Sequence, residues 1–307
     1  MPWEKVTLVG VGLLGGSLGR ALREDPAGEG PLARSVVGLV RREATIREAI
    51  DCGAVDQATL DPEEAVSSAD LVVLCTPLEA MRSLLERLLP YLKEGALVTD
   101  VGSVKGLVSD ELEGVLAAHS AEFVGSHPMA GSDKGGVSES SAGLFKDAVC
   151  VVTPTSSSSQ SAVSRIVQLW EDVGARVMIL DPATHDELVS RCSHLPHVLS
   201  VLLARHVLGA GADSRLGTLC AGGFRDTTRI AAGDVTMWKD ILTQNRARVI
   251  AALDEYLAEL SALRDILVKR DDEKLEQILS DARKRRLNWR KEMREAGRVD
   301  LVRPKSS

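Results

Sequence analysis

The sequence predicts two domains in series: a doubly wound parallel α/β domain over residues 1–181 and an all-helical domain over residues 182–307. From Val6 to Leu180, apolar runs alternate with amphipathic stretches, as strands and crossover helices do in a parallel sheet. Beyond Asp181-Pro182 the strand-like runs end and long stretches with helical spacing take over. The 307 residues, 44% of them hydrophobic, suffice for two ordinary buried cores.

Short apolar runs and amphipathic stretches define the elements of the first domain. The runs predict strands at Val6–Val9, Ser35–Val40, Leu71–Cys75, Ala96–Thr99, Glu122–Val124, Val149–Thr153 and Arg176–Ile179. The helical spacing of Leu, Ala and Val predicts helices at Leu13–Glu24, Glu43–Ile50, Leu78–Leu89 and Gln160–Asp172.

The second domain shows only helical patterns, which pass through Leu202, Trp238, Ile250, Leu267 and Leu279. Helices without a sheet often bury their remaining apolar surface on a second subunit. We therefore expect a homodimer formed through the helical domain.

Charge and aromatic content argue against nucleic acid as a partner. The chain has 37 Lys+Arg against 44 Asp+Glu, a formal net charge of −7, and only nine aromatic residues. Neither property suits binding to a phosphate backbone or stacking on bases. Residues 283–307 are locally basic, with ten Lys+Arg and three Asp+Glu, and are interpreted as a solvated last helix and tail.

The amino-terminal sequence predicts a cytoplasmic protein, because Met1–Lys5 runs directly into a strand pattern without the features of a signal peptide. The most apolar later stretch, Val198–Ala204, is seven residues long, far below the roughly 20 that span a bilayer. The five cysteines are an odd number without a C-x-x-C pair, so we expect reduced thiols.

A glycine motif, Gly10-Val11-Gly12-Leu13-Leu14-Gly15, follows the first predicted strand and opens the first helix. In this place its glycines permit a tight turn, approach of a pyrophosphate to the backbone, and close helix–sheet packing. The first domain is therefore predicted to be a dinucleotide-binding domain of the Rossmann type. The predicted cofactor site consists of Gly10, Gly12, Leu13, Leu14 and Gly15, with Thr76 and Pro77 after a later strand.

The end of the second strand indicates which nicotinamide cofactor is preferred. An NAD site usually has an acidic residue there, whereas this chain has Arg41 and Arg42. Two guanidinium groups suit a 2′-phosphate, which favours NADP over NAD. In the alternative interpretation both arginines are solvated and Glu43 serves the ribose.

Four further motifs stand in order along the chain: Asp100-Val101-Gly102-Ser103-Val104-Lys105, Gly125-Ser126-His127-Pro128-Met129-Ala130-Gly131, Ser193-His194-Leu195-Pro196-His197 and Gly222-Gly223-Phe224-Arg225-Asp226-Thr227-Thr228-Arg229. Together they resemble the prephenate/arogenate dehydrogenase family of tyrosine biosynthesis. The resemblance covers the chain from Val6 to about Leu279. It implies oxidative decarboxylation of a cyclohexadienol, with hydride transfer from ring carbon C4 to the nicotinamide, loss of CO2, and a phenolic product.

The resemblance also implies roles for individual residues. His127 matches the residue that polarises the C4 hydroxyl, and a neutral imidazole accepts such a proton near physiological pH. Ser103 matches a serine near the hydroxyl and the nicotinamide, although it is also placed to cap a helix starting at Val104. Arg229 matches the arginine that binds the ring carboxylate. The predicted substrate site is completed by Trp238, His197 and Gly131.

Two neighbouring residues receive structural interpretations. Arg225 lies four residues before Arg229, so the two would share one face of a helix, and only one needs to bind substrate. His194 and His197 have the spacing of a metal-binding H-x-x-H, but no third ligand cluster is near and hydride transfer needs no metal. No metal site is predicted, and His194 is interpreted as a structural hydrogen-bonding residue.

The chain departs from the family pattern at Ser132-Asp133-Lys134, where relatives often carry Thr and Glu before the lysine. A gating role for that carboxylate is therefore in doubt. Neither a chorismate mutase domain nor a carboxy-terminal regulatory domain fits the length, so feedback by tyrosine, if it occurs, would have to act at the active site.

Several functional hypotheses remain open from the sequence. The leading one is an NADP-preferring prephenate dehydrogenase, and the nearest alternative is arogenate dehydrogenase, whose substrate differs only in its side chain. The others are a different reductase with a helical dimer domain and a non-catalytic NAD(P)-sensing module.

Overall fold

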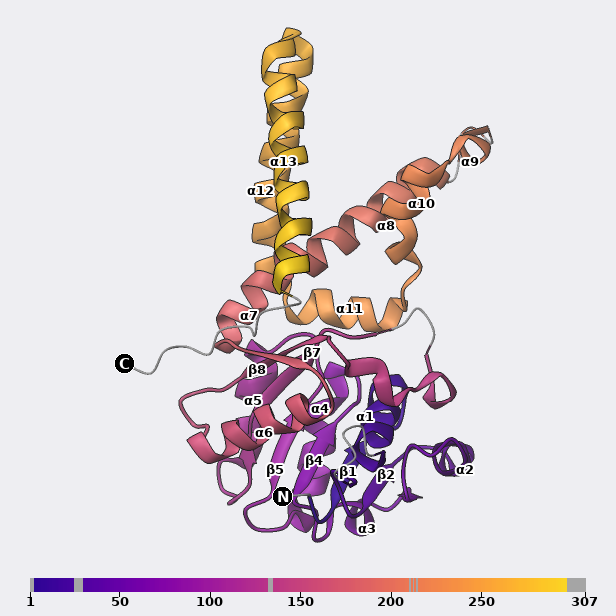
Figure 1. Cartoon of the computed structure of the whole chain (residues 1–307), viewed down its shortest axis with the longest axis vertical. Helices are drawn as coiled ribbons and strands as arrows, with labels where there is room; N and C mark the ends of the chain where they lie inside the picture. The colour runs from indigo at the N-terminus through magenta and orange to yellow at the C-terminus, as the bar shows by residue number, and fades with distance from the viewer. Residues whose placement is uncertain are drawn as a thin grey trace.

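The structure is a computed structural model that describes residues 3–24, 30–131, 135–209, 211, 213 and 215–296. An α/β body carries a set of helices at one end, and two helical arms extend away from it (Figure 1). The Ser132-Asp133-Lys134 segment and the last part of the basic carboxyl-terminal segment lie outside the described residues.

A six-stranded parallel sheet forms the centre of the α/β body, in the order β3-β2-β1-β4-β5-β6. This is the doubly wound order expected for a dinucleotide-binding domain. Residues Val6 and Leu8 of β1 pair with β2 on one side and β4 on the other. The strands are β1 (Val6–Val9), β2 (Val36–Leu39), β3 (Gln57–Thr59), β4 (Leu71–Leu74), β5 (Leu97–Asp100) and β6 (Glu122–Phe123).

Helices cover both faces of this sheet, and each face has its own apolar core. Val73 packs with α1 and α6, whereas Val72 and Leu74 pack with α4 and α5, because successive strand residues point to opposite faces. The helices are α1 (Leu13–Arg23), α2 (Glu43–Asp51), α3 (Pro62–Val66), α4 (Leu78–Leu88), α5 (Gly106–Leu116) and α6 (Gln160–Asp172). The doubly wound fold predicted from the sequence is thus confirmed.

A second, three-stranded sheet lies beside the first and contains β7 (Gly125–Pro128), β8 (Val149–Thr153) and β9 (Arg176–Ile179). Strand β7 is antiparallel to β8, and β8 is parallel to β9. The sequence predicted β8 and β9 as strands but missed β7, which places His127 within a strand rather than in a loop after one. All four residues of β7 are buried despite their mixed polarity.

The remaining chain is helical and begins at Pro182, where the Asp181 side chain accepts a hydrogen bond from the Thr184 backbone amide. Helix α7 (Pro182–Val189) leads through a π-helical turn, η4 (Ser190–His194), into α8 (Leu195–Leu208). The chain continues through α9 (Arg215–Leu219), α10 (Gly222–Thr228), the 3-10 turn η5 (Arg229–Ala232), α11 (Val235–Gln244), α12 (Arg246–Lys269) and α13 (Asp272–Ala296).

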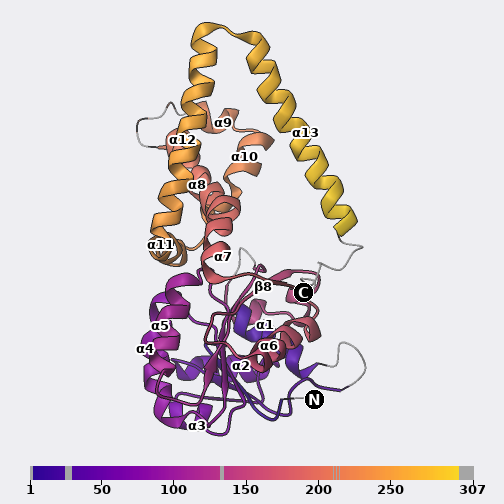
Figure 2. The ribbon, with the colours of Figure 1, turned by 90° about the vertical axis from the view of Figure 1, so that its left-hand side faces the viewer.

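Two arms of the helical part project away from the sheets. Helices α12 and α13 form one antiparallel arm, and α8 with α9 and α10 forms the other (Figures 1 and 2). Both arms leave large apolar side chains exposed in the single chain, among them Leu219, Leu257, Leu267, Val268 and Leu279. Over the ranges described here, no helix combines the length and apolar character that a membrane span requires.

Candidate active site

A cavity of about 520 Å³ opens at the carboxyl ends of β1, β2 and β4. Ligands of doubly wound sheets bind at this edge. Six of the predicted cofactor residues line the cavity: Gly10, Gly12, Arg41, Arg42, Thr76 and Pro77. The other three, Leu13, Leu14 and Gly15, are not part of the described lining. Leu14 instead packs against the apolar core beneath.

The glycines of the motif act at different places. Gly10 has a φ of +93°, and a Cβ there would lie 3.0 Å from the Cys75 carbonyl oxygen. A Cβ on Gly15 would lie 2.2 Å from the Gly10 carbonyl oxygen, so Gly15 permits the contact between helix and turn. Gly12 begins α1 without a side-chain cap, which leaves backbone N–H groups available to an anion.

Three arginines line this cavity: Arg41 and Arg42 directly before α2, and Arg87 from α4. All three side chains are exposed. Glu43 is absent from the described lining, although Glu48 is present. Arg87 was not predicted from the sequence. Ala80 and Leu84 of α4 also line the cavity. Arg87 follows Leu84 by three residues and Ala80 by seven, a helical spacing that indicates a shared face.

His127 lies in β7 and is not part of the described lining of this cavity. The Ser126 backbone amide donates to Asp100 Oδ1 at 3.1 Å, which fixes β7 against the end of β5. The neighbouring pair in the sheet, Leu74 and Asp100, joins β5 to the strand that leads to Thr76. His127 therefore lies near the carboxyl end of β5, at the sheet edge where the cavity opens.

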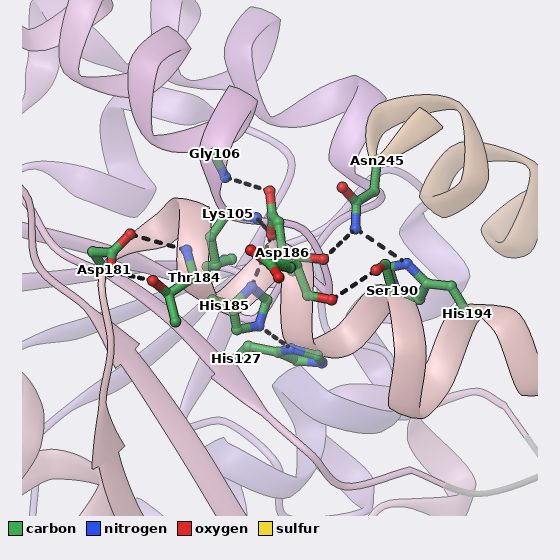
Figure 3. Close-up of polar contacts among 12 residues, drawn as sticks. Lys105, Gly106, His127, Asp181, Thr184, His185, Asp186, Ser190, His194 and Asn245 are labelled. Carbon is green, nitrogen blue, oxygen red and sulfur yellow. Dashed lines mark hydrogen bonds and ion pairs between the residues drawn. The ribbon is translucent and has the colours of Figure 1, made fainter. Parts of the chain in front are cut away.

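A chain of hydrogen bonds extends from His127 into the helical part (Figure 3). His127 Nδ1 lies 2.9 Å from His185 Nε2, with the two rings nearly perpendicular at 72°. His185 Nδ1 lies 2.8 Å from Asp186 Oδ1. All three side chains are buried, and His185 and Asp186 both come from α7.

Asp186 also holds the amino end of α5. Its Oδ1 accepts a hydrogen bond from the Lys105 backbone amide and its Oδ2 from that of Gly106, both at 2.8 Å. Burial acts to raise the pKa of Asp186, but the bonds from His185 and these amides outweigh it and lower the pKa below its ordinary value. The predicted cap, Ser103, does not have this role, because the helix starts at Gly106 rather than Val104.

Beneath His127 lies a buried ion pair between Lys105 and Asp100. The Lys105 ammonium also donates to the Ser126 carbonyl oxygen at 2.9 Å, and neither charged side chain is exposed. Burial lowers the pKa of His127 well below its ordinary value, and His185, Lys105 and His194 act in the same direction. His127 is thus held neutral, which is the form that can accept a proton.

A second group of side chains comes from the helical part alone. The His197 ring lies parallel to the Trp238 indole, with centroids 3.5 Å apart and 7° between the planes. His194 meets the same indole edge-on at 6.2 Å. Asn245 Nδ2 donates to the Asp186 carbonyl oxygen at 2.8 Å and faces His194 Nδ1 at 3.3 Å. Within the described chain, His197 Nδ1 is buried without a hydrogen-bond partner.

The remaining predicted substrate residues are Ser103, Arg229 and Gly131. Ser103 is half-buried in the loop between β5 and α5, two residues before Lys105. Arg229 is exposed and opens the turn η5, so it does not share a helix with Arg225, because α10 ends at Thr228. The turn packs on α8, and a Cβ on the following Gly233 would lie 2.7 Å from Trp238 Nε1.

Gly131 is the last residue described before the segment 132–134, and it is exposed. No group of three His, Cys, Asp or Glu side chains arranged to hold a metal ion occurs in the described ranges. His194 has the structural hydrogen bond that the sequence analysis proposed for it.

Two family models match the chain in succession. The first, described as the nucleotide-binding domain of prephenate dehydrogenase, matches residues 18–179, and the second, described as its dimerization domain, matches residues 181–281. The cyclohexadienyl dehydrogenase of Zymomonas mobilis is 32% identical over 290 residues, which are 93% of this chain and 96% of that protein. The prephenate dehydrogenase of Bacillus subtilis is 31% identical over 274 residues, 89% of this chain and 72% of that protein.

Solved structures agree with these sequence relatives. The prephenate dehydrogenase of Aquifex aeolicus, solved with hydroxyphenyl propionate and NAD+, superposes with a TM-score of 0.86 at 32% identity, covering 94% of this chain and 99% of that one. The arogenate dehydrogenase of Synechocystis gives a TM-score of 0.79 at 29% identity, covering 93% and 99%. The resemblance inferred from the four motifs is confirmed, and the chain belongs to the prephenate dehydrogenase family of NAD(P)-dependent oxidoreductases.

Proposed function

We propose that this enzyme is a prephenate dehydrogenase, which converts prephenate to 4-hydroxyphenylpyruvate and CO2 in tyrosine biosynthesis, with NADP as its preferred hydride acceptor. The observation that carries the proposal is His127, a buried imidazole with a depressed pKa on the edge of the fold that also holds the cofactor cavity. Oxidation of a hydroxyl-bearing carbon needs such an acceptor beside the hydride-accepting ring.

The chemistry assigns a task to each group of the site. A nicotinamide cofactor held by the residues of the cofactor cavity would supply the acceptor for the hydride of substrate C4. His127 takes the proton of the C4 hydroxyl as the hydride leaves. The bond from the ring to its carboxylate then breaks, CO2 departs, and the electron pair left in the ring makes it aromatic. The proton returns to the oxygen that becomes the phenol, so no net proton is consumed.

The other predicted residues would bind and orient the substrate. Arg229 would receive the ring carboxylate through a bidentate guanidinium contact. His197, stacked on Trp238 with an unpartnered Nδ1, would face the substrate side chain. Ser103 would lie near the hydroxyl and the nicotinamide, and Gly131 would border the substrate.

The preference for NADP rests on the arginines of the cofactor cavity. Arg41 and Arg42 line it where an acidic residue would serve the ribose of NAD, and Arg87 adds a third positive charge. A 2′-phosphate makes charge-assisted hydrogen bonds with such groups.

A homodimer formed through the helical domain and a cytoplasmic location belong to the same proposal. The dimer is supported by the apolar side chains exposed on both arms and by the description of the second family model. A cytoplasmic location fits the expectation of reduced cysteines.

The test is to mix the purified enzyme with prephenate or arogenate, each with NADP or NAD, and to follow the reduced nicotinamide by its absorbance. We expect the fastest turnover with prephenate and NADP. Faster turnover with arogenate would favour the alternative, an arogenate dehydrogenase. The similarity to the Synechocystis arogenate dehydrogenase supports this alternative. Absence of turnover in all four mixtures would overturn the proposal in favour of an NAD(P)-sensing module.

A further inference from the structure

We propose that His185 and Asp186 are positioning residues, which hold the proton of His127 on Nδ1 and so leave its Nε2 free to accept the substrate proton. Neither residue belongs to the four motifs that identified the family. The inference rests on the proposed function in one respect, because it explains how His127 is made ready for the proton transfer proposed above.

The direction of the hydrogen bonds is set at Asp186. Both of its carboxylate oxygens accept backbone N–H groups at the start of α5, from Lys105 and Gly106, each at 2.8 Å. Backbone amides only donate, and their number and the helix N-terminus favour an ionised carboxylate. An ionised carboxylate only accepts, so the 2.8 Å contact with His185 requires a proton on His185 Nδ1.

The proton on His185 Nδ1 in turn determines which nitrogen of His127 carries a proton. A neutral imidazole with its proton on Nδ1 has only a lone pair on Nε2. The 2.9 Å contact between His185 Nε2 and His127 Nδ1 is then a hydrogen bond that His127 donates. Neutral His127 therefore has an unprotonated Nε2. If His185 were doubly protonated, it would donate to His127 Nδ1 and place the His127 proton on Nε2, where it would block the reaction.

The environment keeps both rings in place. His185 has no exposed surface, and the perpendicular packing of the two rings, with centroids 5.1 Å apart, opposes rotation of either. Asn245, at the start of α12, donates to the backbone carbonyl of Asp186 and so links α12 to α7, the helix that contains His185 and Asp186. A histidine in the helical part thus sets the proton position of a histidine in the α/β part.

The first test reads the tautomer directly and needs no substrate. Full-length enzyme labelled with 15N-histidine is studied by NMR at mildly alkaline pH, and two-bond couplings identify which ring nitrogen carries the proton. The signals of His127 and His185 are assigned by their loss in His127→Asn and His185→Gln. We expect the Nδ1–H form for both residues. An Nε2–H form or an imidazolium at His127 would overturn the proposal.

The second test compares substitutions that keep or remove the polarity of the contact. In His185→Gln an amide oxygen can still accept the His127 proton, whereas in His185→Leu nothing can. We expect His185→Leu to lower kcat by about 100-fold, within the range of general acid–base catalysis, and His185→Gln by about tenfold or less. The KM for NADP should change by less than about twofold in both variants, because the cofactor cavity is intact.

A matched control separates this effect from loosened packing between the two parts of the chain. Asp240 Oδ2 accepts a hydrogen bond from the Glu79 backbone amide at 3.0 Å, a partly buried link between α11 and α4 that does not involve His127. Asp240→Ala removes this acceptor, so it should lower the melting temperature and leave kcat near the wild-type value. Equal losses of kcat in His185→Gln and His185→Leu that track the melting temperature would overturn the proposal. If the wild-type enzyme turned over none of the four mixtures, the proposed function would fail, while the tautomer measurement would still decide the present inference.

Discussion

The imidazole of His197 lies parallel to the indole of Trp238, with ring centroids 3.5 Å apart. The two residues come from α8 and α11, so the stack joins two helices of the helical part. Trp238 also meets the edge of His194, which faces Asn245. The indole therefore orients the histidine that we place beside the substrate side chain.

Replacement of Trp238 by Leu should raise the KM for substrate by about 2- to 12-fold, because an aromatic pair contributes about 0.5–1.5 kcal/mol beyond its buried area. Trp238→Phe keeps a ring beneath His197 and should change KM by less than Trp238→Leu. Steady-state kinetics with saturating cofactor measure this difference. Equal KM values for the two variants would contradict the role of the stack.

Replacement of both Arg41 and Arg42 by Ala should weaken NADP by about 10- to 150-fold, since a charge-assisted hydrogen bond contributes about 1.5–3 kcal/mol. NAD, which lacks the 2′-phosphate, should be affected much less. Arg47→Ala is the matched control, because Arg47 is exposed in α2, directly after these arginines, but outside the described lining of the cavity. Fluorescence titration with each reduced cofactor measures the affinities. Equal losses for NADP and NAD would refute the assignment of the arginines to the phosphate.

Local patterns were sufficient for most of the α/β body. The glycine motif, the alternation of apolar runs and the change at Pro182 predicted the central strands and the order of the two parts. Strand β7 was not predicted, because Gly125-Ser126-His127-Pro128 has no alternation of apolar and polar residues, although tertiary contacts bury all four residues. Strand β3 was not predicted either, because Gln57–Thr59 is only three residues long and its burial is uneven.

The predicted site residues were all named from sequence motifs. His127 and six of the cofactor residues were named from local sequence, and the structure brings them to one edge of the fold. His185 and Asp186 lie almost 60 residues away from His127 in the chain, in a helix whose start looks like any other Pro-initiated helix. The packing of α7 against α5 places them beside His127. No local sequence pattern predicts a contact between residues so far apart in the chain.

The buried histidines predict how the stability depends on pH. Burial lowers the pKa of His194 to about 4, and burial lowers those of His127 and His197 as well. The unfolded chain, with an ordinary histidine pKa near 6.5, then binds more protons than the folded protein below that pH. Stability is therefore full above about pH 6.5 and falls as the pH is lowered toward 4.

For His194 alone this loss is about 3 kcal/mol, since one pKa unit corresponds to about 1.4 kcal/mol. Urea unfolding at a series of pH values measures it. In His194→Asn, an amide oxygen can replace Nδ1 as the acceptor for Asn245, and the slope between these pH values should become shallower. An unchanged slope would show that His194 is not the group responsible.

Replacement of Arg229 by Lys should raise the KM for substrate at least tenfold, because an ammonium cannot form the two parallel hydrogen bonds of a guanidinium with a carboxylate. Arg225→Lys is the matched control: it makes the same change four residues earlier, in α10. Steady-state kinetics should show the change in KM for Arg229→Lys only. A KM that stayed at the wild-type value would remove Arg229 from the substrate site.

Two glycines of the same motif should respond differently to a methyl group. A Cβ on Gly12 meets nothing within 4 Å and Gly12 lines the cavity, so Gly12→Ala should fold normally but bind NADP at least tenfold more weakly. A Cβ on Gly15 would lie 2.2 Å from the Gly10 carbonyl oxygen, so Gly15→Ala must push α1 away from the turn, at about 1–3 kcal/mol. Calorimetry and cofactor titration of both variants separate the effects. If Gly12→Ala lost stability and Gly15→Ala did not, the surroundings described for Gly12 and Gly15 would be wrong.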